Sequence, residues 1–152
     1  MKLEDIRLRV IVLGRHDWER SVTRYMLIKG GFHVREACDD AEAISRHREL
    51  PCDALVLHVD RTLGDVARAA REIQAQSPSV KVISLVDHPA EPQTIDFLLE
   101  QVGEHPILVK PFAVDSFWRL ILALPYELKL RGDRECSPGS VGSRSADTEA
   151  ES

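Results

Sequence analysis

The sequence is poor in the features that mark disulfide-rich, zinc-binding and nucleic-acid-binding proteins. It has three cysteines in 152 residues, Cys38, Cys52 and Cys136, and no two of them form a Cys-x-x-Cys pair. This odd count and wide spacing argue against a disulfide framework and against a structural zinc site. The formal net charge of −5 provides no basic surface for nonspecific binding to nucleic acid. We therefore expect no nucleic-acid partner.

Long apolar runs and the signatures of nucleotide-binding enzymes are missing as well. No apolar stretch approaches the roughly 20 residues that span a bilayer. Residues 1–9 alternate charged with apolar side chains, so no signal peptide is visible. Neither a Gly-x-Gly-x-x-Gly fingerprint nor a Walker sequence nor a nucleophile elbow occurs. The sequence therefore predicts a cytoplasmic protein that has no membrane partner and is not an enzyme.

Five short apolar segments alternate with five segments of helical pattern. The expected strands are residues 8–13, 32–37, 54–59, 80–86 and 107–109, and the expected helices are 17–29, 41–50, 64–76, a segment ending at 103, and 115–124. Such alternation predicts parallel strands joined by right-handed crossovers. We expect an α/β fold of the flavodoxin-like type, a three-layer sandwich. In it, helices cover both faces of a five-stranded parallel sheet of order 2-1-3-4-5.

The apolar pattern ends before the chain does. From Gly132 the sequence is rich in Ser, Gly, Glu and Arg, a composition typical of disorder. We expect one domain over residues 1–131 and a disordered acidic tail over residues 132–152.

The segment over residues 106–112, Pro-Ile-Leu-Val-Lys-Pro-Phe, resembles the last strand and loop of a response-regulator receiver domain. With the strand pattern, the resemblance spans roughly residues 7–124. It implies magnesium-dependent phosphoryl transfer to an aspartate at the end of the third strand. In that family, two acids after the first strand help to hold the metal, and a hydroxyl, an aromatic and a lysine contact the phosphoryl group.

Most positions that would carry this chemistry are changed in the present chain. The acidic pair aligns with Gly14 and Arg15, the acceptor with His58, the hydroxyl with Val86, the aromatic with Ile107, and the lysine with Lys110. Magnesium prefers oxygen ligands, whereas this set offers none and adds the fixed cation of Arg15. We therefore interpret the chain as a degenerate receiver, a pseudo-receiver with no catalytic residue, no metal and no cofactor. Arg15 is expected to occupy the place of the missing metal.

The retained Lys110 allows two interpretations. The resemblance implies a Lys-Pro bond that shapes the loop, so Lys110 can serve the structure alone. Alternatively, it contacts a partner or an anion.

Other chemistries stay open at the same edge of the sheet. Asp60 could act as an alternative phosphoacceptor with Asp17 as its acidic companion, although an ion pair of Asp60 with Arg15 or Lys110, or a capping role, is the simpler interpretation. Phosphorylation of His58 itself is a third alternative.

A ligand-binding module is a further alternative. A transition metal could bind a set of histidines and acids after the strands, namely His16, His58, His88, Asp17, Asp60 and Asp87. An anionic nucleotide could instead bind Arg15, Arg61 and Lys110.

Two of the expected helices carry broad apolar patterns. In the first, Trp18, Val22, Tyr25 and Met26 share one face, and Asp17 can cap the start. In the last, Phe117, Leu120, Ile121 and Leu124 form a core stripe with Trp118 and Leu122 beside it. A helix that is apolar beyond its core stripe is usually covered, either by residues 126–131 folding back or by a partner.

The function predicted from these features is protein–protein interaction in bacterial two-component signalling. The expected interaction face comprises Phe117, Trp118 and Leu122. The resemblance implies that this face also includes the fourth helix and the fifth strand. Its partner would be a histidine kinase, a regulator or an effector, or a second copy of the chain.

Overall fold

The computed structural model describes residues 7–60, 63–87, 90–110 and 115–124. The expectations for Arg61, His88, residues 111–112 and the segments 126–131 and 132–152 lie outside these residues. Contacts divide the chain into two units, Met1–Leu122 and Ala123–Ser152. The architecture given below is that of the first unit.

The first unit contains one parallel sheet of five strands in the order β2-β1-β3-β4-β5, which confirms the predicted fold class. The strands are β1 (Arg9–Leu13), β2 (His33–Ala37), β3 (Ala54–Val59), β4 (Lys81–Val86) and β5 (Ile107–Val109). Every residue of the central strand β3 is buried. Its nearly continuous apolar sequence follows from this burial, because a parallel strand between two helical layers faces no water.

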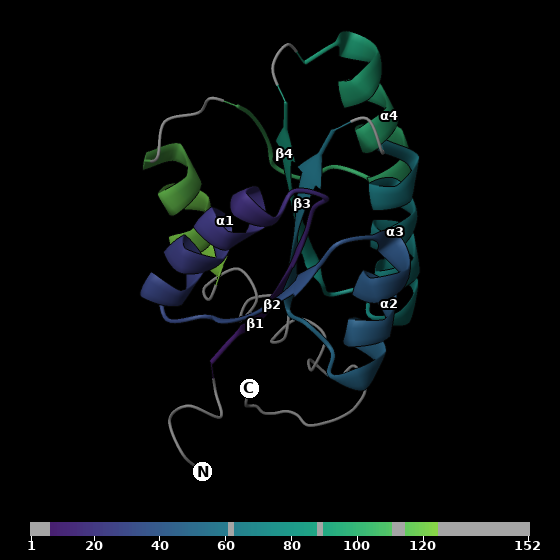
Figure 1. Ribbon diagram of the computed structural model, residues 1–152. Helices are drawn as coiled ribbons and strands as arrows, with labels where there is room; N and C mark the ends of the chain where they lie inside the picture. Colours follow the sequence, from purple (N-terminus) through teal and green to yellow (C-terminus); the bar gives the residue numbers. More distant parts are fainter. Residues whose placement is uncertain (1–6, 61–62, 88–89, 111–114, 125–152) are drawn as a thin grey trace, which may run out of the picture. The chain divides into compact units, whose positions relative to one another are not determined.

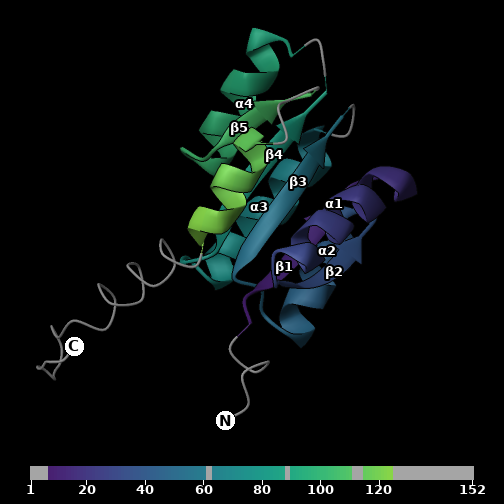
Figure 2. The ribbon, with the colours of Figure 1, turned by 90° about the vertical axis from the view of Figure 1, so that its left-hand side faces the viewer.

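Helices lie on both faces of the sheet (Figure 1). They are α1 (Asp17–Lys29), α2 (Asp40–Glu49), α3 (Leu63–Gln76), α4 (Pro92–Val102) and a last helix over residues 115–124, here called the C-terminal helix. Helix α1 and the C-terminal helix cover one face and α2, α3 and α4 cover the other (Figures 1 and 2). Among the described residues, no helix combines the length and apolar character required to cross a bilayer.

Of the two predicted N-cap residues, one is confirmed and one differs. Asp39 is the N-cap of α2, and its side chain accepts a hydrogen bond from the backbone N–H of Glu42 at 2.8 Å, as the capping-box spacing predicts. The N-cap of α1 is His16 rather than Asp17, which is the first helical residue. The prediction that Asp17 caps α1 is therefore wrong by one position, because Asp17 pairs with Arg20 one turn later.

The apolar face of α1 points away from the sheet. Trp18, Val22 and Tyr25 are 69%, 52% and 62% exposed. The inward face instead buries Arg20 and Thr23 beside Leu27. Polar side chains can occupy an inward face when each finds a hydrogen-bond partner, and both do in this structure.

Candidate functional site

Gly14 and His58 occupy one space at the carboxyl ends of β1 and β3. The register pairs Leu13 with Leu57, so Gly14 lies beside His58. A Cβ atom placed on Gly14 would lie 2.9 Å from His58 Cβ and 3.2 Å from His58 Cγ. The absence of a side chain at residue 14 therefore makes room for the imidazole at residue 58.

The imidazole of His58 is buried and neutral. Its side chain is 6% exposed, and its Nε2 atom lies 2.9 Å from Thr23 Oγ1 on α1. Among the described residues Nδ1 has no hydrogen-bond partner, and the nearest carboxylate oxygen, Glu19 Oε1, is 4.0 Å away. Burial, with the nearby cations of Lys110 and Arg20, lowers the pKa of His58 to about 3. His58 is thus a packed core side chain joined to α1.

Acidification is expected to destabilise the fold through His58. The unfolded imidazole titrates near pH ~6.5, so the unfolded chain binds more protons than the folded one between this pH and about 3. The contribution of neutral His58 is therefore complete above pH ~6.5 and is lost as the pH falls, at up to about 1.4 kcal/mol per pH unit. Denaturant unfolding as a function of pH measures this slope.

The variant His58→Asn, which cannot titrate, should show a shallower slope. Burial also lowers the pKa of His47 and of His105, and these two contribute equally to both proteins. An unchanged slope in His58→Asn would contradict the assignment.

Lys110 forms two ion pairs. Its Nζ atom lies 3.2 Å from Glu19 Oε2 and 3.1 Å from Asp87 Oδ1. Glu19 comes from the first turn of α1 and Asp87 directly follows β4, so Lys110 joins three elements at this edge of the sheet. This arrangement favours the interpretation of Lys110 as a structural residue. Neither partner was predicted, because residue types gave no sign that the two acids lie beside Lys110.

Arg20 is the buried cation near the end of β1. It is 9% exposed and donates hydrogen bonds to the carbonyl oxygen of Gly14, to Glu36 Oε1 at 3.0 Å and to Asp17 Oδ1. Burial alone would lower the pKa of Arg20, but its hydrogen bonds to Asp17 and Glu36 raise it above the ordinary value. The sequence analysis did not single out Arg20. The only local indication was its position three residues after Asp17, a spacing that allows an ion pair on one helix.

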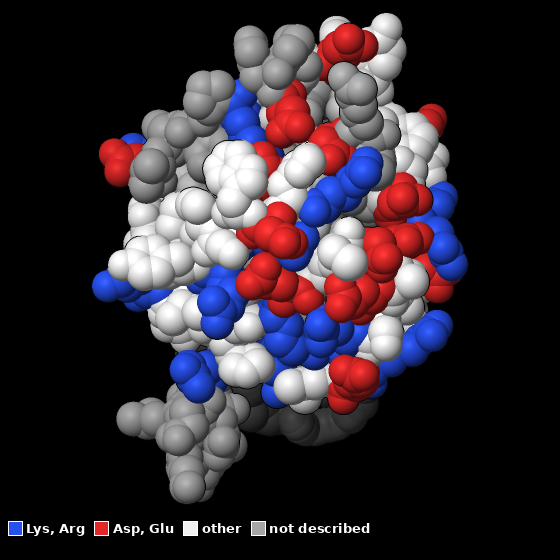
Figure 3. Space-filling view, viewed as in Figure 1, with Lys and Arg blue, Asp and Glu red and all other residues white. Residues whose placement is uncertain are grey.

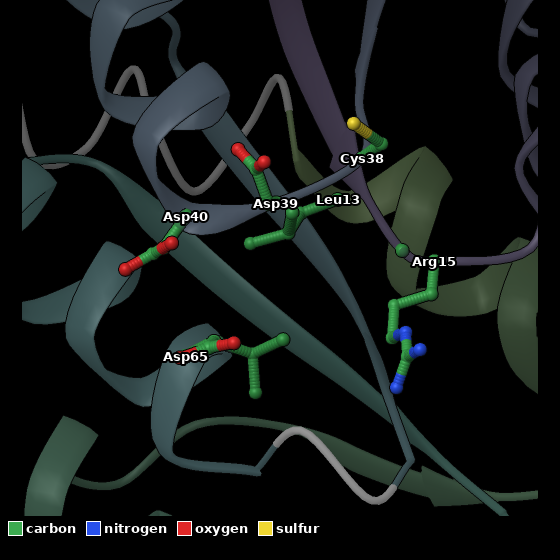
Figure 4. A pocket seen from close by; sticks show the side chains of 8 residues that line it. Leu13, Arg15, Cys38, Asp39, Asp40 and Asp65 are labelled. Carbon is green, nitrogen blue, oxygen red and sulfur yellow. The ribbon is translucent and has the colours of Figure 1, made fainter.

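Arg15 lines a separate cavity of about 320 Å³. Three carboxylates line the same cavity, those of Asp39, Asp40 and Asp65. Figure 4 shows the Arg15 guanidinium across the cavity from Asp40 and Asp65. Asp40 is paired with Arg68 at 2.8 Å, and Asp39 caps α2. That Arg15 takes the place of a metal remains a prediction.

This geometry can be compared with solved structures. NtrX from Brucella abortus in complex with ADP superposes with a TM-score of 0.74 at 18% identity, over 86% of this chain and 29% of that one. The Vibrio cholerae chemotaxis protein CheY4 gives 0.67 at 18% identity, over 78% and 98%. The beryllofluoride-activated NtrC4 receiver domain, solved as a dimer, gives 0.64 at 25% identity, over 80% and 97%.

This chain has the receiver fold. It spans 29% of the length of the NtrX chain and nearly all of CheY4. By sequence, no protein-family model and no curated protein matches it.

Two further positions of the receiver pattern are filled by apolar side chains. Val86 is 3% exposed, and Ile107 packs against the core cluster. Both side chains serve packing, and neither offers a hydroxyl group or an aromatic ring.

The alternative acceptor Asp60 and its proposed companion Asp17 have separate ion-pair partners. Asp60 Oδ2 lies 3.6 Å from His16 Nε2, whereas Asp17 is bound by Arg20 and is 91% exposed. Within the described ranges, no group of three or more His, Cys, Asp or Glu side chains could hold a metal. The set of histidines considered as an alternative metal site includes His88, which is not described, and His58, whose Nε2 faces Thr23.

One residue of the predicted interaction face belongs to the core. Phe117 is 0% exposed, so it cannot contact a partner, and its assignment to the face is corrected. Trp118 is half-buried, with its Cζ3 atom 3.1 Å from the position of a Cβ on Gly30. Leu122 is 63% exposed, and Leu99 of α4 and Val109 of β5 are 39% and 37% exposed. The exposed apolar side chains of α4, β5 and the C-terminal helix are therefore Leu99, Val109 and Leu122.

Proposed function

We propose that this chain is a pseudo-receiver that acts as a protein–protein interaction module in bacterial two-component signalling. It works in the cytoplasm without phosphorylation, metal or enzymatic activity. The observation that carries the proposal is the pair of Gly14 and His58, which fills the phosphoacceptor region with a neutral, buried imidazole. The receiver fold supports the signalling context, and the changed residues support the loss of phosphoryl transfer.

Phosphoryl transfer to a receiver needs a carboxylate nucleophile and a divalent cation. At the acceptor position this chain has an imidazole whose Nε2 already faces Thr23. The cations around it are Lys110 and Arg20, and each is already bound to carboxylates of the chain itself. Glu19 and Asp87, the carboxylates that lie beside Lys110, are already paired with its ammonium, so a divalent ion would have to displace this cation in order to bind them.

Without phosphoryl transfer, the function that we propose is the binding of a partner protein to the surface of the domain. Leu99, Val109 and Leu122 expose apolar area on α4, β5 and the C-terminal helix, the three elements through which the family resemblance implies contact with a partner. We assign this surface to a signalling partner, a histidine kinase, a regulator or an effector. The NtrC4 receiver domain, which has the same fold, was solved as a dimer.

Incubation with acetyl phosphate and magnesium is expected to leave the mass of the intact protein unchanged. The reason is that the chain lacks the aligned carboxylate acceptor and its acidic pair. Asp60→Asn is the matched control, since Asp60 lies two residues beyond the acceptor position. A phosphoryl adduct on the wild type that disappears in Asp60→Asn would make Asp60 the acceptor and overturn the proposal.

A further inference from the structure

Helix α1 exposes a line of large side chains that the described part of the chain leaves uncovered. Trp18, Val22, Tyr25 and Lys29 follow one another at spacings of four, three and four residues, so they lie along one side of the helix. The first three are more than half exposed, and Lys29 Nζ lies 5.4 Å from the centroid of the Tyr25 ring. We call these four residues the α1 stripe.

The α1 stripe lies on the outer side of the first unit. The opposite face of the helix packs on the sheet through Arg20, Thr23 and Leu27. The space-filling view shows uncharged side chains gathered over α1, with Lys and Arg beside them (Figure 3). Ile28, 45% exposed, widens the apolar surface at one side. A contiguous apolar surface of this kind on a small domain usually marks a contact with another protein.

The spacing of the α1 stripe matches a helical partner with the same stripe. Four-three-four spacing is that of successive d, a, d and a positions of a heptad. When two such helices pack antiparallel, d positions of one face a positions of the other. Trp18 of one copy then faces Lys29 of the other, and Val22 faces Tyr25. The first contact places an ammonium on an indole ring, and the second places a small side chain against a large one.

We propose that the α1 stripe is a self-association surface, on which two copies of this chain pack their α1 helices antiparallel. A parallel pair would bring Lys29 against Lys29 and Trp18 against Trp18, with like charges adjacent. The antiparallel pair instead places the acidic N-terminal end of one helix, at Asp17, beside the basic C-terminal end of the other, at Lys29. It also opposes the two helix dipoles favourably.

The small area of the α1 stripe indicates a weak dimer. An aromatic side chain buries about 150–250 Å² when fully covered, and a standard interface buries about 800 Å² per partner. Two aromatics, Val22 and Ile28 supply only part of this area, so the dimer is weak and depends on protein concentration.

Sedimentation equilibrium over a wide concentration range tests the surface. The wild type is expected to pass from the mass of one chain to twice that mass. Trp18→Ala and Tyr25→Ala should each raise the dissociation constant at least about tenfold. Leu122→Ala, which removes an equally exposed apolar side chain from the C-terminal helix, should leave it unchanged. A wild type that stays monomeric throughout, or a dimer broken by Leu122→Ala and not by the α1 variants, would overturn the proposal.

A double-mutant cycle tests the antiparallel geometry. Trp18 and Lys29 are eleven residues apart, about 16 Å along one helix, so they do not touch within one copy. Across the dimer they meet, and combining Trp18→Ala with Lys29→Ala should weaken it at least about threefold less than the product of the single effects. Effects that simply multiply would refute this pairing. All these positions are exposed, so the substitutions should leave the unfolding midpoint unchanged. If the wild type proves to be monomeric, the self-association proposal fails, but the phosphoryl-transfer prediction, which is tested by intact mass, is not affected.

Discussion

Replacing Arg20 with leucine is expected to lower the free energy of unfolding by about 2–3 kcal/mol. The guanidinium is nearly buried and satisfies the Gly14 carbonyl, Glu36 and Asp17 at once. Leucine would leave the buried Gly14 carbonyl without its donor and Glu36 without its strongest partner. Most of the cost comes from the buried Gly14 carbonyl and the partly buried Glu36, because Asp17 is 91% exposed and can be hydrated instead.

Arg24→Leu provides the matched control for this prediction. Arg24 also pairs with Glu36, at 3.7 Å, but its side chain is 49% exposed. Exposed ion pairs contribute about 0–1 kcal/mol, so this variant should unfold at nearly the wild-type denaturant concentration. If urea unfolding showed the same decrease in the free energy of unfolding for both variants, the buried contacts of Arg20 would contribute no more than an exposed ion pair.

Replacing Gly14 with alanine is expected to cost about 1–3 kcal/mol, the usual penalty for overpacking a filled core. The added Cβ would lie 2.9 Å from His58 Cβ, well inside van der Waals contact, so β1 and β3 must separate to accept it. Gly64→Ala is the matched control. A Cβ on Gly64, in α3, meets no described atom within 4 Å, and alanine is the better helix former by up to about 1 kcal/mol.

The two glycine variants should therefore shift the unfolding midpoint in opposite directions. If Gly14→Ala were as stable as the wild type, the steric coupling between residues 14 and 58 would be refuted. The coupling has a functional consequence, because an acidic residue at position 14 meets the same obstacle. If the chain is the pseudo-receiver proposed above, an acidic residue at position 14 would therefore also require the side chain at position 58 to move.

Residue types and their periodicity were enough to predict the fold, whereas the loss of phosphoryl transfer that they also indicated stays a prediction. Five apolar segments of strand length between helical patterns predicted a parallel sheet, because burial on both faces requires nearly continuous apolar strands. The strand order was predicted from the flavodoxin-like arrangement. The missing carboxylates at Gly14, Arg15 and His58 were visible directly in the sequence. Asp39 and Glu42 also predicted the start of α2, since a cap is a local interaction.

Contacts between distant residues were beyond such reasoning. Lys110 and Glu19 are 91 residues apart, and only the tertiary fold brings the residue that follows β5 and the first turn of α1 to the same edge of the sheet. The outward direction of Trp18, Val22 and Tyr25 was hidden for a related reason. Apolar periodicity predicts that a face will be covered, but the tertiary partners of Arg20 and Thr23 decide that the polar face is the one turned inward.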